Sequence, residues 1–216
     1  MDSAPHVPIS RSLFALAIFY GGMVCIAGVL GNKQVALGPL AVEAGIFAFL
    51  LLVVVSSAVA ELHGRAVANR LVLIGFVPLL ASMALSWIVV QLPSAPSMEP
   101  ERIEAFTLMM SSTWRIWAGG IAAYGLSQIL NVTIFDALKR RGGKLLWLRA
   151  GISSVLSQVL DTFIFVTVAF YGVFPIGQLI VGQMIAKVVL SIVLVPALIY
   201  VFVGLGRKLD RTEVPA

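Results

Sequence analysis

Long apolar stretches alternate with short polar ones along the whole chain. Six of these stretches hold the roughly 20 mostly apolar residues that a helix needs to cross the hydrocarbon core of a bilayer. The pattern predicts an all-α integral membrane protein, one domain over residues 1–216, with six transmembrane helices at roughly 12–31, 43–61, 67–91, 112–138, 147–171 and 177–205. Pro78 is expected to kink the third helix, and residues 101–110 to form a short helix at the membrane surface.

The basic residues of the loops predict the orientation. Lys and Arg concentrate in cytoplasmic loops under the positive-inside rule. Eleven basic residues fall on one side of the predicted helices, and two, Lys33 and Arg102, fall on the other. Both termini are therefore expected in the cytoplasm, with residues 92–111 on the opposite side.

The composition argues against several classes of protein and of site. The 216 residues are 60% hydrophobic and 12% charged, whereas a soluble domain is about 45–50% apolar and about 25% charged. The net charge of +5 lies in the loops, so no nucleic-acid partner is expected. Cys25 is the one cysteine and the two histidines are far apart, which predicts neither a disulfide nor a metal site. Walker A and G-x-S-x-G patterns are absent, so we expect no ATPase of its own, no catalytic residues and no cofactor.

Two charged residues lie near the middle of predicted helices. Asp161 is in the fifth and Lys187 is in the sixth. A charge at bilayer depth costs at least about 2.5–3.5 kcal/mol on insertion scales, so it usually faces a partner or a watery cavity. One interpretation is a structural salt bridge, between these two residues or with Arg115, and the other is a polar site or path. The two overlap, since a salt bridge can open to admit a cationic ligand.

Further polar residues share helical faces with these charges. The faces carry Tyr124, Gln128, Asn131 and Phe135 in the fourth helix, Ser154, Ser157, Gln158, Asp161 and Phe165 in the fifth, and Gln183, Lys187 and Ser191 in the sixth. Amide side chains offer donors and acceptors together, which suits the edge of a heterocyclic base. They also serve as hydrogen bonds between membrane helices, and both interpretations stay open here.

Nearly the whole chain, and most strongly the part from residue 115 on, resembles the queuosine precursor transporter family, also called the vitamin uptake transporter (VUT) family. The resemblance rests on two sequence motifs. The first includes Gln128, Asn131 and Phe135, and the second includes Ser154, Gln158, Asp161, Thr162 and Phe165. Lys187 with Pro196, Asn32 and the stretch 60–70 also match the family pattern. The chain departs from the family pattern at Leu51, where a proline is often found, and at Ser57 and Gln183, where relatives can carry a carboxylate. The smaller number of carboxylates bears on which ligand is preferred.

The resemblance implies a six-helix importer of the cell inner membrane whose cargo is a 7-deazapurine, preQ0 or preQ1. The substrate-binding residues would be Asn32, Arg115, Tyr124, Gln128, Asn131, Gln158, Asp161, Phe165, Gln183 and Lys187. The partners would be this small molecule and the lipid bilayer, with a homodimer left open. Alternatives are the substrate-binding membrane subunit of an ATP-driven vitamin importer, a transporter of another purine-like or vitamin-like solute, and a structural or assembly protein of the membrane.

Overall fold

A computed structural model describes residues 10–31, 33–38, 40–110, 114–142, 144–172 and 176–211. Its elements, in chain order, are α1 (Arg11–Leu30), β1 (Gln34–Leu37), β2 (Leu40–Glu43), α2 (Gly45–His63), α3 (Arg65–Ile74), α4 (Phe76–Gln91), α5 (Pro100–Met110), α6 (Trp114–Arg140), α7 (Leu146–Phe170) and α8 (Ile176–Arg211). Within the described residues, six helical stretches are long and apolar enough to span a membrane, with α3 and α4 forming one of them. The predicted all-α membrane fold is confirmed.

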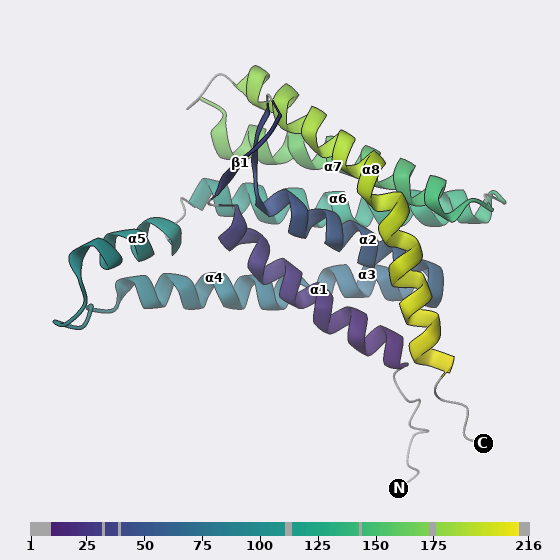
Figure 1. Ribbon diagram of the computed structural model, residues 1–216, viewed down its shortest axis with the longest axis horizontal. Coiled ribbons are helices and arrows are strands. Elements are labelled where there is room, and N and C mark those ends of the chain that lie inside the picture. Colours follow the sequence, from purple (N-terminus) through teal and green to yellow (C-terminus); the bar gives the residue numbers. More distant parts are fainter. Residues whose placement is uncertain are drawn as a thin grey trace, which may run out of the picture.

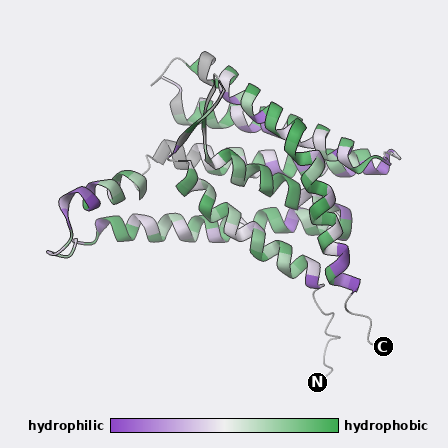
Figure 2. Ribbon diagram, viewed as in Figure 1, coloured by the Kyte–Doolittle hydropathy of each residue, from purple (hydrophilic) through white to green (hydrophobic). Residues whose placement is uncertain are grey.

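The helices form a bundle with two distinct ends (Figure 1). The start of α1 and the end of α8 lie at one end, which we call the termini end. The strands β1 and β2 and the short helix α5 lie toward the other, which we call the hairpin end. Hydrophilic residues gather near the ends of the elements, and the long helices are mostly apolar along their lengths (Figure 2).

Helix α2 is the centre of the bundle. Its residues 52–60 are all at most 1% exposed, and it packs against α1, α3, α6, α7 and α8. This stretch consists of one Leu followed by Val, Ser and Ala, and such small or compact side chains let neighbouring helices approach closely. Helix α4 contains no buried residue and packs against α1, α3 and α5.

The third predicted span is interrupted at Gly75, one turn before Pro78. A proline lacks the N–H that would bond to the carbonyl four residues earlier, and its ring presses on that carbonyl. The disturbance therefore falls on the turn that precedes Pro78. The two pieces, α3 and α4, still run as one membrane-spanning length of 27 residues.

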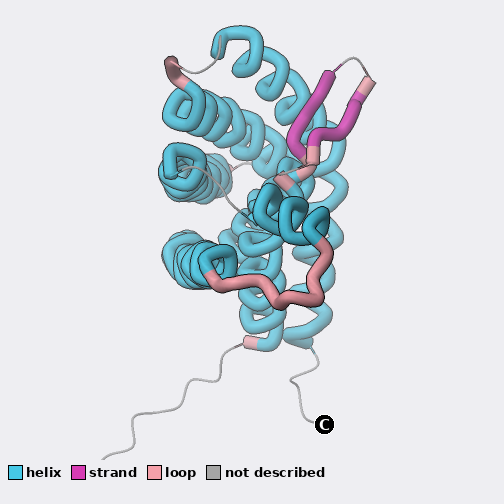
Figure 3. Tube along the Cα trace, turned by 90° about the vertical axis from the view of Figure 1, so that its left-hand side faces the viewer, coloured by secondary structure: helices cyan, strands magenta, loops and turns pink. Residues whose placement is uncertain are grey.

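A short β-hairpin follows α1, where the sequence analysis predicted only a break before a helix at residue 43. Strands β1 and β2 pair antiparallel, with Gln34 opposite Glu43 and Leu37 opposite Leu40, and Figure 3 shows them to one side of the helices. Gly38 in the turn has φ +60°, a left-handed conformation that glycine adopts without a steric penalty. The second predicted helix consequently begins at Gly45.

Helix α8 is longer than predicted and ends in contact with α1. Its 36 residues correspond to about 54 Å, and Asp210 near its end accepts hydrogen bonds from the backbone N–H and hydroxyl of Ser12 at 3.0 and 2.7 Å. The same hydroxyl is 2.8 Å from Nε2 of His63 at the end of α2. These contacts join three helices at the termini end.

Candidate functional site

Asp161 of α7 and Lys187 of α8 form a buried ion pair. Nζ of Lys187 lies 2.7 Å from Oδ2 of Asp161, and the side chains are 12% and 4% exposed, respectively. Ser127 of α6 donates a 3.2 Å hydrogen bond to the other carboxylate oxygen, Oδ1. Pairing of this kind compensates two charges for the loss of water. The pairing predicted from the sequence is confirmed.

A cavity of about 470 Å³ lies beside this ion pair, in the half of the bundle toward the hairpin end. Its volume falls within the range of about 300–1,000 Å³ that is usual for small-molecule pockets. Asp161, Gln183 and Lys187 supply charged and amide groups to its lining, and most other lining residues are apolar. A mostly apolar cavity with a few polar groups on one side can fix the orientation of a small, flat, polar ligand.

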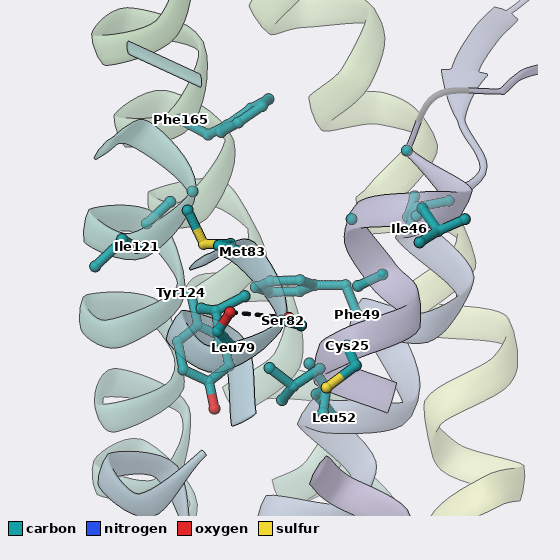
Figure 4. A pocket seen from close by; sticks show the side chains of 18 of the residues that line it. Cys25, Ile46, Phe49, Leu52, Leu79, Ser82, Met83, Ile121, Tyr124 and Phe165 are labelled. Carbon is teal, nitrogen blue, oxygen red and sulfur yellow. Dashed lines mark hydrogen bonds between the residues drawn. The ribbon is translucent and has the colours of Figure 1, made fainter. Parts of the chain in front are cut away.

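Three aromatic side chains line the cavity. Figure 4 shows Phe49 reaching from α2 toward Tyr124 of α6, with Phe165 of α7 further along. The Tyr124 hydroxyl lies 3.0 Å from that of Tyr20 and 3.3 Å from the carbonyl oxygen of Val72. Since neither partner lines the cavity, Tyr124 contributes its ring to the cavity and its hydroxyl to the packing of α1, α3 and α6.

A second group of polar side chains lies one to two turns from Asp161 toward the termini end. We call it the inner polar layer, and it consists of Ser56, Ser57, Gln128, Asn131, Ser154, Gln158 and Ser191. Nδ2 of Asn131 donates to the hydroxyls of Ser56 and Ser57 at 3.0 Å each, and the Ser56 hydroxyl donates to Oε1 of Gln128 at 3.1 Å. All seven residues are at most 1% exposed. None of them lines the cavity.

The structure thus separates the residues that the sequence analysis named as substrate-binding. The cavity lining includes Tyr124, Asp161, Phe165, Gln183 and Lys187, and the inner polar layer holds Gln128, Asn131 and Gln158. Asn32 lies outside the described residues, and so does the side chain of Arg115. For Gln128 and Asn131, the contacts with α2 show the helix-bridging use of amides that the sequence left open.

Sequence reasoning missed the contribution of α1 and α4 to the cavity. Cys25 of α1 and Ser82 and Met83 of α4 lie on its wall, and Figure 4 shows these three side chains around that of Phe49. The available signal was the glycine-rich end of α1, because glycines at positions 28 and 31 leave room beside a helix. In the described part of the chain, no group of three or more His, Cys, Asp or Glu residues is placed to hold a metal ion.

Comparison with known proteins shows a clear family relationship. A family profile described as "Putative vitamin uptake transporter" matches residues 43–201, which is well over half of the chain. The chain belongs to this family. It is also 30% identical over 142 residues to a protein of Bacillus subtilis (strain 168) named "Probable queuosine precursor transporter", a match that covers 63% of this chain and 61% of that relative. No solved structure gave a significant match.

The region shared with the vitamin uptake transporter family contains the ion pair and the whole inner polar layer. It begins at the last residue of β2 and ends within α8. Helix α1, which carries Cys25, lies outside it. One wall of the cavity is therefore built by a segment that lies outside the family match.

Proposed function

We propose that the chain imports a queuosine precursor, a 7-deazapurine such as preQ0 or preQ1, across the cell inner membrane. The observation that carries the proposal is the Asp161–Lys187 pair beside a cavity with aromatic walls. Membership of a transporter family and the printed name of the Bacillus subtilis relative support the same substrate class.

The chemistry of a guanine-like base suits this pair of charges. Its ring N–H and exocyclic amine are donors on the same edge as a carbonyl oxygen acceptor. A carboxylate accepts from such donors, and an ammonium group donates to the carbonyl. Asp161 and Lys187 offer both partners side by side, while Phe49, Tyr124 and Phe165 offer rings against which a flat base can pack.

Binding would require the ion pair to exchange its internal contacts for contacts with the base. In the structure Lys187 and Ser127 each engage one oxygen of Asp161. A base that inserts its edge here replaces each of these bonds with one of its own, so neither charge is left without a partner. The ammonium group of preQ1 offers a further possibility, because it can take the place of Lys187 beside the carboxylate.

The proposed direction follows from the distribution of charge. Lys139, Arg140, Arg149 and Lys208 lie at the termini end, which the positive-inside rule assigns to the cytoplasm. The cavity lies toward the opposite end, so this arrangement would receive substrate from outside the cytoplasm. Release would require the bundle to open at the termini end.

The proposal is tested by feeding preQ0 or preQ1 to a strain that cannot make the precursor and measuring queuosine in its tRNA. The wild-type chain should restore queuosine. Asp161→Asn should lower the rate of incorporation about 10- to 150-fold, the range expected for the loss of a hydrogen bond to a charged group. Asp136→Asn is the matched control, because it removes a carboxylate that pairs with Arg140 far from the cavity and should leave the rate unchanged.

Binding itself can be followed through Cys25, the single cysteine of the chain. The thiol belongs to a residue that lines the cavity, so bound preQ0 or preQ1 should slow its reaction with a maleimide in the purified protein. If wild type restores no queuosine under any feeding and neither compound protects Cys25, the substrate assignment is wrong. Full activity of a well-folded Asp161→Asn variant would remove that residue from the site.

A further inference from the structure

The inner polar layer contains buried polar atoms with no hydrogen-bond partner among the described residues. They are Nε2 of Gln128, Oδ1 of Asn131, Oγ of Ser154, both Oε1 and Nε2 of Gln158, and Oγ of Ser191. All five side chains are 0% exposed. Buried polar groups in folded proteins are nearly always bonded, so each such atom calls for an explanation. Here they belong to α6, α7 and α8, and α7 packs against both of the other helices.

The register of the helices brings these atoms together. Ser127 bonds to Asp161, so α6 and α7, which run antiparallel, place the next turn of α6, Gln128–Asn131, beside Gln158. Lys187 bonds to Asp161, and Gly151 lies against Pro196 further along, so Ser191 is placed opposite Gln158. The unpartnered groups therefore lie together directly beyond the ion pair, on its side toward the termini end.

Hydrogen bonding between helices explains only some of the polar side chains in the inner polar layer. Asn131 and Gln128 are joined to α2 through Ser56 and Ser57, as expected of amides that hold helices together. Gln158, by contrast, bonds to no described residue with either end of its amide. Neighbouring hydroxyls on the same helix do find partners. Ser153 donates to the carbonyl of Ala150 at 3.2 Å, and Thr162 donates to that of Gln158 at 2.9 Å.

The layer is closed off from the termini end by a second set of charges. Glu61 of α2 pairs with Lys139 of α6 at 3.1 Å and with Arg149 of α7 at 3.2 Å. The guanidinium of Arg149 also lies 5.0 Å from the centre of the Phe135 ring, which is fully buried. The unpartnered amides thus lie between two ion-paired barriers, with the cavity beyond one and the termini end beyond the other.

We infer that the inner polar layer is a second binding position for the base, occupied after it leaves the cavity and before it reaches the cytoplasm. The inference rests on the proposed function. The ligand class follows from the hydrogen-bonding groups of the layer. The amide of Gln158 offers a donor and an acceptor together, and the hydroxyls of Ser154 and Ser191 can each donate or accept a hydrogen bond. Such groups match the edge of a neutral heterocycle. The layer contains no charged side chain, so it holds the base less tightly than Asp161 and Lys187 do, which suits a position on the way to release.

The test compares binding with transport in the same variants of the full chain. In Gln158→Leu, preQ0 and preQ1 should still protect Cys25 at concentrations within twofold of those for wild type, because the cavity is unaltered. The rate of queuosine incorporation in fed cells should fall at least tenfold. The apparent melting temperature should not fall, since the replaced amide has no partner to lose.

A pair of adjacent serines supplies the matched control and covers the case in which Gln158→Leu does not fold. Ser154→Ala removes an unpartnered hydroxyl of the layer and should slow incorporation with Cys25 protection intact. Ser153→Ala removes a hydroxyl that bonds only within α7 and should transport as wild type does.

The outcomes separate this inference from the proposed function. If wild type transports and protects Cys25 but Gln158→Leu and Ser154→Ala transport within twofold of it, the inner layer is structural or filled with water, and only the inference fails. If wild type itself gives neither protection nor incorporation, the proposed function fails. Equal loss of protection and transport in Gln158→Leu would place that residue in the cavity site and also overturn a separate second position.

Discussion

The ion pair between Asp161 and Lys187 should couple strongly in a double-mutant cycle. Its charged atoms are 2.7 Å apart, and the side chains are almost wholly withdrawn from solvent. At an effective dielectric constant of 20 this separation corresponds to an attraction of roughly 6 kcal/mol, before the cost of desolvating both groups is subtracted. The desolvation cost cancels much of this attraction, so the pair taken as a whole contributes little net stability.

The single and double variants should therefore behave very differently. Asp161→Asn retains an acceptor for the hydroxyl of Ser127 but leaves Lys187 buried and unpaired, which should destabilise the fold by about 3–5 kcal/mol. Lys187→Met leaves the carboxylate unpaired and should have a similar effect. The double variant removes both charges, and we expect it to lose less than about 3 kcal/mol. The coupling energy would then be at least about 3 kcal/mol, in the upper range for residues in direct contact.

The measurement is reversible unfolding of the purified chain in mixed micelles by titration with sodium dodecyl sulfate. Asp136 and Arg140 provide the control cycle, because their side chains also form an ion pair, at 2.8 Å, but that of Arg140 is 74% exposed. An exposed pair of this kind couples by at most about 1 kcal/mol. Additive losses for Asp161→Asn and Lys187→Met would show that the buried pair is not energetically coupled, and the reasoning from its geometry would be refuted.

Two further predictions concern packing and orientation. A Cβ at Gly75 would overlap the Tyr124 hydroxyl and lie 2.9 Å from the Tyr20 ring, so Gly75→Ala should destabilise the protein by about 1–3 kcal/mol. In the same unfolding assay Gly22→Ala, whose new methyl meets nothing within 4 Å, should be neutral or slightly stabilising; equal effects of the two would contradict the packing argument. Reporter fusions at Ser97 and after Arg211 should report opposite sides of the membrane, with the second in the cytoplasm, and a common side would refute the predicted topology.

The order and number of the spans could be predicted from the sequence because each depends on a local property. A helix that crosses a bilayer must satisfy its own backbone hydrogen bonds and present apolar side chains over about 20 residues. Asp161 and Lys187 could be paired for a similar reason. An unpaired charge is energetically costly at bilayer depth, and each of these two residues lies near the middle of one of two consecutive spans.

Which residues line the cavity depended on tertiary structure. Helical periodicity places Tyr124, Gln128 and Asn131 on one face, but Asn131 comes seven residues after Tyr124, a rise of about 10 Å along the helix axis. Tyr124 therefore reaches the cavity, whereas Asn131 reaches Ser56 and Ser57 of α2. Periodicity states which residues share a face and carries no information about which neighbour that face meets at each depth.

The central position of α2 and the use of α1 and α4 as cavity walls were likewise decided by packing. All these helices have similar apolar sequences, yet residues 52–60 of α2 are buried by protein and α4 has no buried residue. In a bilayer, lipid and protein are equally apolar surroundings, so hydrophobicity alone does not distinguish a lipid-facing helix from a buried one. The sequence by itself determined which segments enter the membrane and which two charges need each other. The packing of the helices decided where a cavity was left between the helices.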